Sequence, residues 1–162
     1  MSRQYPCEIT NMVMIYDKKR EKVLVINRKK KYKGISFCGG HVEKCESVYE
    51  SAKREALEET GLYISSLIPC GLVHWTKKSG EKYLEFLYKT EEFSGEIKSG
   101  TDEGDIFWLD CKELFSRNDL SQNFDKYLPV FFSEGYTELY FEYEDDFSGD
   151  GTYYPSITEE QK

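Results

Sequence analysis

The chain has few of the residues that histidine-based catalysis, zinc sites and disulfide frameworks require. It contains only two histidines, His41 and His74, so neither a histidine-ligated metal site nor a catalytic triad is expected. Its five cysteines are odd in number and include no CxxC pair, which argues against a disulfide framework and against a zinc knuckle. The chemistry is therefore expected to rest on other side chains.

Long apolar runs and an excess of positive charge are also missing. No run approaches the roughly 18 residues that span a bilayer, and the first ten residues lack the layout of a secretory signal. We expect a cytoplasmic protein with no membrane partner. The net charge of −8 would repel a nucleic-acid backbone, so duplex binding is not favoured. A phosphorylated small molecule remains a suitable ligand if a divalent metal and a local basic patch offset the repulsion.

One basic patch lies early in the chain, apart from the acidic segments 46–59 and 134–162. Two interpretations fit it, a solvated loop between strands and a loop that faces phosphate. The patch consists of Arg28, Lys29, Lys30, Lys31 and Lys33.

Aromatic and apolar side chains are abundant. They make up 15% and 39% of the 162 residues, which suffices for one sizeable core and is too much for a disordered chain. The length fits one domain and is too short for two well-packed ones. We expect a single domain over residues 1–145 and a polar, frayed tail over 146–162. Monomer and homodimer both stay open.

Alternating and apolar segments predict strands before, between and after two helices. This order indicates an α+β or layered α/β/α domain with a mixed sheet. A first helix is expected over 47–60, because Ser47 and Glu50 form a capping box and Gly61 supplies a left-handed end. The last aromatic segment could form a dimer surface or close the sheet, and we favour the sheet. The other expected elements are a helix over 121–132, which Pro129 could end or kink, and strands over 10–17, 22–27, 35–37, 71–75, 83–90, 105–109 and 137–143.

Carboxylates gather on or beside the first expected helix. At about 100° per residue, Glu55 and Glu59 point within ~40° of each other on its apolar side. Burying like charges is unfavourable unless a cation neutralises them, and Mg²⁺ typically joins protein carboxylates to a substrate phosphate. The alternative is an exposed acidic helix balanced by Lys53 and Arg54. The four carboxylates are those of Glu46, Glu55, Glu58 and Glu59.

The spacing of these residues resembles the Nudix box. Gly40 is followed after five residues by Glu46, and after seven more by the run Arg54-Glu55-Ala56-Leu57-Glu58-Glu59-Thr60-Gly61-Leu62. All seven Gly, Glu and Arg positions of the box agree, and Ala56 stands where the family usually carries a larger aliphatic residue. The resemblance extends from about residue 9 to 143. It implies the Nudix fold, an α/β/α sandwich, and hydrolysis of a nucleoside diphosphate linked to another group X.

By this resemblance, Glu58 and Glu59 would bind Mg²⁺ or Mn²⁺. Glu55 would bind metal or act as the base, and the carbonyl of Gly39 would complete the ligand set. Arg54 would orient the carboxylates through charge-assisted hydrogen bonds. The implied reaction is attack of a water molecule on one phosphorus, without a covalent enzyme intermediate.

Supporting roles and an alternative base follow from the same resemblance. Gly40, Glu46 and Gly61 would support the loop and the helix. Because some family members use a base outside the box, Asp102 and Glu103 are further candidates, with Glu103 favoured. An ordinary turn is the alternative reading of that pair.

Three segments resemble the MutT-like group within the family, which hydrolyses oxidised purine nucleoside triphosphates such as 8-oxo-dGTP to the monophosphate and pyrophosphate. Asn123 stands where these proteins carry a base-reading asparagine, and an amide can both donate to and accept from a purine. Phe37 and Leu120 could form the walls of the base site or simply belong to the core. The three segments are Thr10-Asn11-Met12-Val13, Gly39-Gly40-His41-Val42-Glu43 and Gly104-Asp105-Ile106-Phe107-Trp108.

Other functions remain open at this point. The same chemistry could act on ADP-ribose, a dinucleoside polyphosphate or an RNA 5′ end. A non-catalytic Nudix domain that senses a nucleotide is a hypothesis from another class. Such domains commonly lose carboxylates of the box, whereas Glu55, Glu58 and Glu59 are all present here.

Overall fold

The computed structural model describes residues 4–143 and 151–155. Ten strands and three helices are assigned within these ranges. The helices are α1 (Val48–Thr60), α2 (Cys111–Leu114) and α3 (Phe124–Phe132). The strands are β1 (Cys7–Asp17), β2 (Lys22–Arg28), β3 (Gly34–Ser36), β4 (Tyr63–Ile64), β5 (Ile68–Lys77), β6 (Lys82–Thr90), β7 (Phe93–Ser94), β8 (Gly104–Asp110), β9 (Tyr136–Tyr143) and β10 (Gly151–Pro155).

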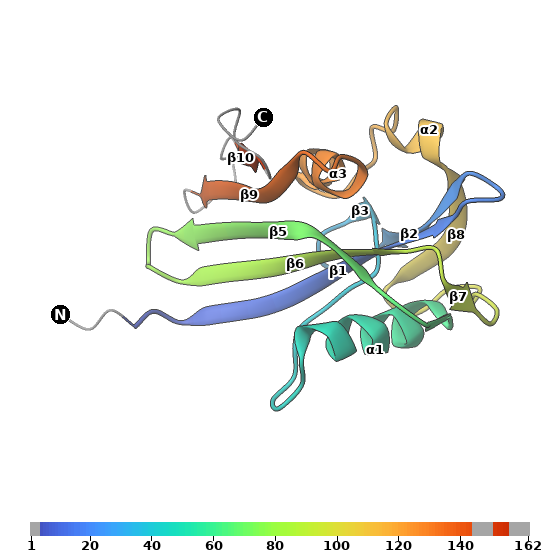
Figure 1. The fold of residues 1–162 in the computed structure, drawn as a ribbon, viewed down its shortest axis with the longest axis horizontal. Helices are drawn as coiled ribbons and strands as arrows, with labels where there is room; N and C mark the ends of the chain where they lie inside the picture. Colours follow the sequence, from blue (N-terminus) through green and yellow to red (C-terminus); the bar gives the residue numbers. More distant parts are fainter. Residues whose placement is uncertain (1–3, 144–150, 156–162) are drawn as a thin grey trace.

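A mixed sheet forms the middle layer of the molecule (Figure 1). Its strands follow the order β10-β9-β5-β6-β1-β2-β3, and β8 pairs with β2. The pairs β1–β6 and β5–β9 are parallel, while the other pairs of this sheet are antiparallel. Helix α1 covers one face, and α2 and α3 lie on the other (Figure 1). This arrangement confirms the expected α/β/α sandwich with a mixed sheet.

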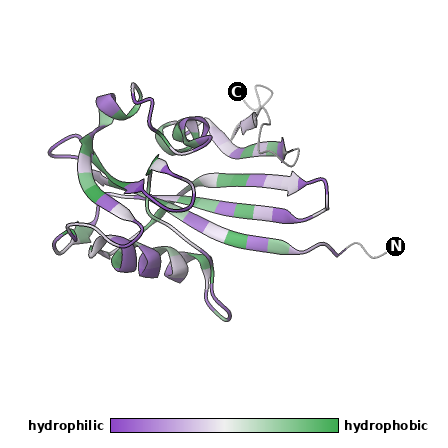
Figure 2. Cartoon of the chain, turned by 180° about the vertical axis from the view of Figure 1, so that it is seen from behind, coloured by the Kyte–Doolittle hydropathy of each residue, from purple (hydrophilic) through white to green (hydrophobic). Residues whose placement is uncertain are grey.

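The central strands are buried on both faces. On β1, Val13 and Ile15 belong to the core beneath α1, whereas Met14 belongs to the core beneath α3. On β2, Leu24 and Val25 divide in the same way, because successive side chains of a strand point to opposite faces. Figure 2 shows many hydrophobic positions on the strands and a mostly hydrophilic α1. The sheet therefore supplies most of the apolar surface that both helical layers cover.

Local signals fix both ends of α1. The Ser47 hydroxyl accepts the backbone N–H of Glu50 at 3.1 Å, which satisfies a free donor of the first turn. Gly61 adopts the left-handed conformation with φ 84°, and its N–H donates to the carbonyl of Leu57 at 2.9 Å. The predicted helix is thus confirmed to within one residue.

The second predicted helix begins later than expected. The residues just before it pair with β3 instead of forming a helical turn. The N–H of Ser121 donates to the carbonyl of Ile35 at 2.9 Å. Asn123 then turns the chain in a left-handed conformation, φ 61°, and α3 starts at the next residue. Pro129 does not end α3, which continues to Phe132. Two short elements were not expected, α2 and the separate β4–β7 pair.

The C-terminal strands correct the expectation of a wholly frayed tail. Strand β9 joins the sheet beside β5 and buries Phe141 completely, as we favoured. Strand β10 pairs antiparallel with β9, so the prediction for that part was wrong. The hydroxyl of Tyr153 donates to the carbonyl of Lys126 at 2.8 Å, which ties β10 to α3. The remainder of the expected tail lies outside the described residues.

None of the helices in the described part of the chain combines the length and apolar character that a membrane crossing requires.

Candidate active site

The loop after β3 runs alongside β1 and reaches α1. The N–H of Asn11 donates to the carbonyl of Gly40 at 2.9 Å, and the N–H of Val13 donates to that of Cys38 at 2.8 Å. A Cβ atom on Gly40 would lie 2.5–2.7 Å from the carboxyl atoms of Glu55. Only glycine therefore lets the loop approach this carboxylate without displacing it.

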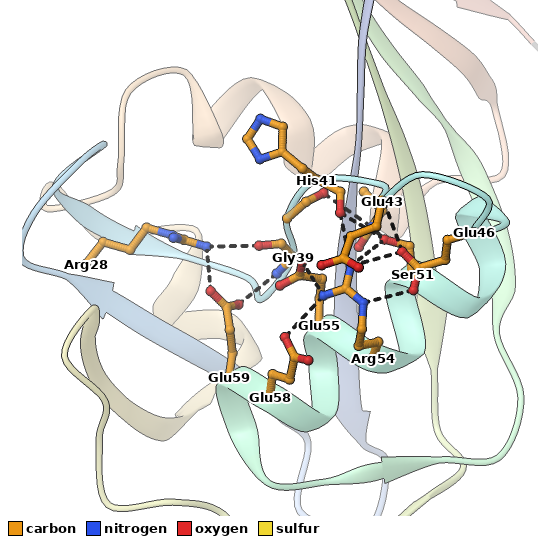
Figure 3. Close-up of polar contacts among 12 residues, drawn as sticks. Arg28, Gly39, His41, Glu43, Glu46, Ser51, Arg54, Glu55, Glu58 and Glu59 are labelled. Carbon is orange, nitrogen blue, oxygen red and sulfur yellow. Dashed lines mark hydrogen bonds and ion pairs between the residues drawn. The ribbon is translucent and has the colours of Figure 1, made fainter.

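Arg54 is the centre of a network of carboxylates (Figure 3). It forms a bidentate pair with Glu46, with Nε–Oε1 and Nη2–Oε2 distances of 2.8 and 3.0 Å. Its Nη1 reaches Glu55 at 2.9 Å and Glu58 at 3.1 Å. Hydrogen bonds from Arg54 lower the pKa of Glu46 to about 2. Arg54 thus occupies a position from which it can orient the box carboxylates.

Glu59 is the most deeply placed carboxylate of α1 and is only 9% exposed. Its Oε2 accepts the N–H of Gly39 at 2.9 Å, and its Oε1 lies 3.3 Å from Nη2 of Arg28 (Figure 3). Burial raises the pKa of Glu59 to about 7, although Arg28 and the Gly39 N–H act in the opposite direction. Burial also raises the pKa of Glu55. The helix therefore presents two poorly hydrated carboxylates to the protein body, as its periodicity predicted.

Two further carboxylates lie nearer to solvent. The Glu58 side chain is 59% exposed and is held by Arg54. Glu103, 57% exposed, accepts a hydrogen bond from Nη1 of Arg28 at 3.2 Å. Glu103 lines the cavity described next, whereas Asp102 does not. The fold therefore places Glu103, the favoured candidate base outside the box, beside Arg28, which also contacts Glu59.

A cavity of about 630 Å³ opens in front of these groups, a size usual for small-molecule sites. Gly39, Gly40, Glu55 and Glu59 line it from the side of the box. Three members of the basic patch also line it, whereas Lys29 instead pairs with Asp105 at 2.7 Å. This favours the phosphate-facing interpretation of the patch. The three basic residues are Arg28, Lys30 and Lys31.

The predicted base-site residues fall in different places. Asn123 lines the cavity just ahead of α3. Phe37 also borders it but is fully buried, with ring centroids 4.9 Å from Phe124 and 5.0 Å from Phe131. Leu120 does not line the cavity; it bridges to Ile35 and packs on the core. For Leu120 the structure thus supports the core alternative rather than the wall.

Several cavity residues were missed by sequence reasoning because no local motif marks them. Asn11, 1% exposed, joins β1 to α1 by donating from Nδ2 to the Ser51 hydroxyl at 3.0 Å. Glu85 and Tyr127 come from β6 and α3 and meet across the cavity. Only the alternation of β6 between apolar and polar positions could have drawn attention to Glu85.

The residues of the box suit a hard divalent metal by donor type. Carboxylates and a backbone carbonyl are the oxygen ligands that Mg²⁺ and Mn²⁺ prefer, and a cation would offset the burial of Glu55 and Glu59. In the described part of the chain, no three His, Cys, Asp or Glu side chains converge as a ready-made metal cluster. Arg28 and Arg54 neutralise the carboxylates instead.

Comparisons with known proteins agree with this fold. The model of the NUDIX domain matches residues 8–131, so the chain belongs to the NUDIX domain family. An uncharacterized Nudix hydrolase of Bacillus subtilis, YvcI, is 29% identical over 114 residues, covering 68% of this chain and 70% of that protein. The 8-oxo-dGDP phosphatase NUDT18 of Danio rerio is 29% identical over 115 residues, covering 68% of this chain and 34% of that protein.

Solved structures share the fold. The MutT protein of Bacillus halodurans superposes with a TM-score of 0.74 at 24% identity, covering 92% of this chain and 97% of that one. The NUDIX domain of Shewanella oneidensis NrtR, crystallised with ADP ribose, gives a TM-score of 0.57 at 14% identity, covering 80% and 88%. At these identities the likeness shows the fold alone.

Proposed function

We propose that this protein hydrolyses an oxidised purine nucleoside triphosphate, such as 8-oxo-dGTP, to the monophosphate and pyrophosphate. The observation that carries the proposal is a single cavity that joins Glu55 and Glu59 of α1 to Asn123 ahead of α3. Carboxylates at one side suit metal-assisted phosphate chemistry, and an amide at the other can donate to and accept from a purine. Membership of the NUDIX domain family supports the hydrolytic reaction.

Glu55, Glu58, Glu59 and the carbonyl of Gly39 are the groups proposed to hold the metal. Mg²⁺ or Mn²⁺ bound there would supply charge neutralisation on the phosphates and acidify a water molecule. Arg54 keeps Glu55 and Glu58 in position through its hydrogen bonds.

Phosphate attraction and proton transfer are assigned to side chains that line the cavity. Lys30 and Lys31 are placed to attract the phosphates. Glu55 and Glu103 are the proposed acceptors for the proton of the attacking water. Glu103 is exposed enough to return that proton to solvent.

A substrate panel tests the proposal. Hydrolysis of 8-oxo-dGTP, dGTP, ATP and ADP-ribose is compared at low micromolar concentration with Mg²⁺, and products are identified by chromatography. We expect a large preference in kcat/KM for the oxidised nucleotide, with pyrophosphate released. Dominant cleavage of ADP-ribose would refute it.

A second candidate substrate is the oxidised nucleoside diphosphate. The Danio rerio relative is named an 8-oxo-dGDP phosphatase, and it matches 68% of this chain. With 8-oxo-dGDP the product beside the monophosphate is phosphate rather than pyrophosphate. Measuring kcat/KM for both nucleotides in the same assay decides between the two candidates.

A further inference from the structure

Glu85 places a carboxyl group at the side of the cavity opposite the box. On β6, Tyr83, Glu85 and Leu87 alternate onto the face that α3 covers, and Leu87 is fully buried there. Asn123 and Tyr127 line the same cavity from the chain entering α3 and from α3 itself. Glu85 therefore lies among the groups that would surround a base.

Strand β1 separates Glu85 from the loop that carries the box glycines. Thr10 of β1 pairs with Glu85 on one side and forms a bridge to His41 on the other. Two interstrand spacings amount to roughly 10 Å. A carboxyl at this distance lies apart from the proposed metal ligands and leaves room for a sugar between them.

Glu85 is half-buried in the wall of the cavity. Burial raises its pKa to about 7, although a hydrogen bond with Tyr127 and the more distant charges of Arg28 and His41 lower it. Among the described ion pairs of the cavity none includes Glu85. Trp75 and Tyr83, which also line the cavity, stack with ring centroids 4.9 Å apart and an interplanar angle of 3°. An acceptor of this kind, beside flat apolar walls, suits a planar ligand that brings its own N–H donors.

We infer that Glu85 determines base specificity by accepting two hydrogen bonds from the N1–H and 2-amino groups of a guanine-type base. The inference rests on the proposed function and names the base that its substrate carries. A carboxylate offers two acceptor oxygens, and guanine alone among the common bases presents two adjacent N–H donors on one edge. Adenine and cytosine present one donor beside one acceptor, which leaves one carboxylate oxygen facing a lone pair.

The same edge is present in guanine and in 8-oxoguanine. Glu85 therefore selects guanine-type bases without separating the oxidised from the normal form. Other groups of the cavity must distinguish the oxidised from the normal base, and Asn123 is the residue proposed to do so. The two residues thus make separable contributions to specificity.

Binding of the monophosphate product to the whole protein tests this inference without turnover. Calorimetric titrations with dGMP, dIMP, which lacks the 2-amino group, and dAMP are carried out on the wild type, Glu85→Gln and Glu138→Gln. We expect the wild type to bind dGMP at least about tenfold more tightly than dIMP or dAMP, because an unmatched buried acceptor is costly. In Glu85→Gln the preference for dGMP over dIMP should fall below about twofold, since the new amide N–H opposes a base N–H.

Glu138 is a matched control, because it lies on β9 outside the cavity lining and loses the same charge. Equal binding of dGMP and dIMP to the wild type, or an unchanged preference in Glu85→Gln, would overturn the inference. Titration of the wild type with 1-methyl-dGMP removes one donor without any mutation and should weaken binding at least about tenfold.

The titrations also separate this inference from the proposed function. Selective dGMP binding without triphosphate hydrolysis would refute the proposed function and leave the role of Glu85 intact. Triphosphate hydrolysis without selective binding of dGMP would refute the role of Glu85 and leave the proposed function intact.

Discussion

The guanidinium of Arg28, on β2, lies 3.3 Å from the carboxylate of Glu59, on α1. The same arginine reaches Glu103 at 3.2 Å and the carbonyl of Gly39 at 3.5 Å. One cation from the sheet thus contacts three groups proposed for metal binding or proton transfer. A metal that took Glu59 as a ligand would compete with Arg28 for this carboxylate, and Arg28 would then be available to a substrate phosphate.

Glu58 and Glu59 are expected to be essential for turnover but not for folding. Glu58→Gln and Glu59→Gln should each lower kcat by at least about 100-fold, because each removes a carboxylate proposed to hold the metal that would balance the phosphate charge. Thermal unfolding of Glu58→Gln should stay close to that of the wild type, because this side chain is 59% exposed. Glu50→Gln, an exposed change on the same helix, serves as the control. Survival of activity in Glu58→Gln would mean that its metal assignment is wrong.

Arg54→Lys should impair catalysis although it keeps the positive charge. Lysine cannot form the bidentate pair with Glu46 and still reach Glu55, so the carboxylates lose their fixed positions. We expect kcat/KM to fall about 10- to 100-fold, as for other residues that orient ligands. Steady-state kinetics measure this, with Arg117→Lys, in an exposed ion-pair cluster, as the comparison. Equal losses in both variants would argue against a positioning role.

Gly40→Ala should displace the carboxylate of Glu55. The new Cβ atom would lie within 2.5–2.7 Å of that group, closer than contact distance permits. The flexible side chain can move away, so we expect a loss of kcat of at least about tenfold with the fold retained. Gly135→Ala is the control, since its nearest neighbour is the Ser133 hydroxyl at an exposed turn. Unchanged kcat in Gly40→Ala would show that the position of Glu55 is not critical.

Asn123 can be tested for base reading separately from its backbone conformation. Its φ of 61° is tolerated by glycine and strained for alanine. Asn123→Gly therefore removes the amide while keeping the turn, and should reduce the ratio of kcat/KM for 8-oxo-dGTP over dGTP at least about fivefold. Asn123→Ala should in addition lower thermal stability. If the ratio is the same in Asn123→Gly and wild type, the amide does not read the base.

The protonation of Glu85 makes stability depend on pH. Its pKa is about 7 in the folded protein and about 4.3 in an unfolded chain. Below pH 4 the group is protonated in both states, and above pH 7 the folded state carries the full cost of a buried charge. One pKa unit corresponds to about 1.4 kcal/mol, so Glu85→Gln should be more stable than wild type by about 1–3 kcal/mol at pH 8. The difference should shrink as pH falls to about 4.5; urea unfolding across this range measures it.

Features set by neighbours in the chain were predictable from the sequence. The ends of α1 follow from Ser47 and Gly61, whose capping hydrogen bonds reach no further than four residues. The helical period placed Glu55 and Glu59 on the inward side of the helix, and the low exposed fractions of both side chains agree. For α1, capping residues and helical periodicity were therefore sufficient to predict both the ends of the helix and its inward face.

Features set by distant parts of the chain were not predictable. Arg28 was noticed only as part of a basic patch, because its contact with Glu59 depends on how β2 lies against α1. The start of α3 was misplaced because Ser121 pairs with Ile35, far away in the sequence. Glu85 was overlooked, because a carboxyl on a strand normally faces solvent. In each case a tertiary contact outweighed a local preference.

Strand β10 covers an edge of β9 that would otherwise be unpaired. An unpaired strand edge is a template for strands of other chains, and β9 would present such an edge without its partner. Removal of residues 151–155 should therefore leave the cavity intact but promote aggregation through β9 at high concentration.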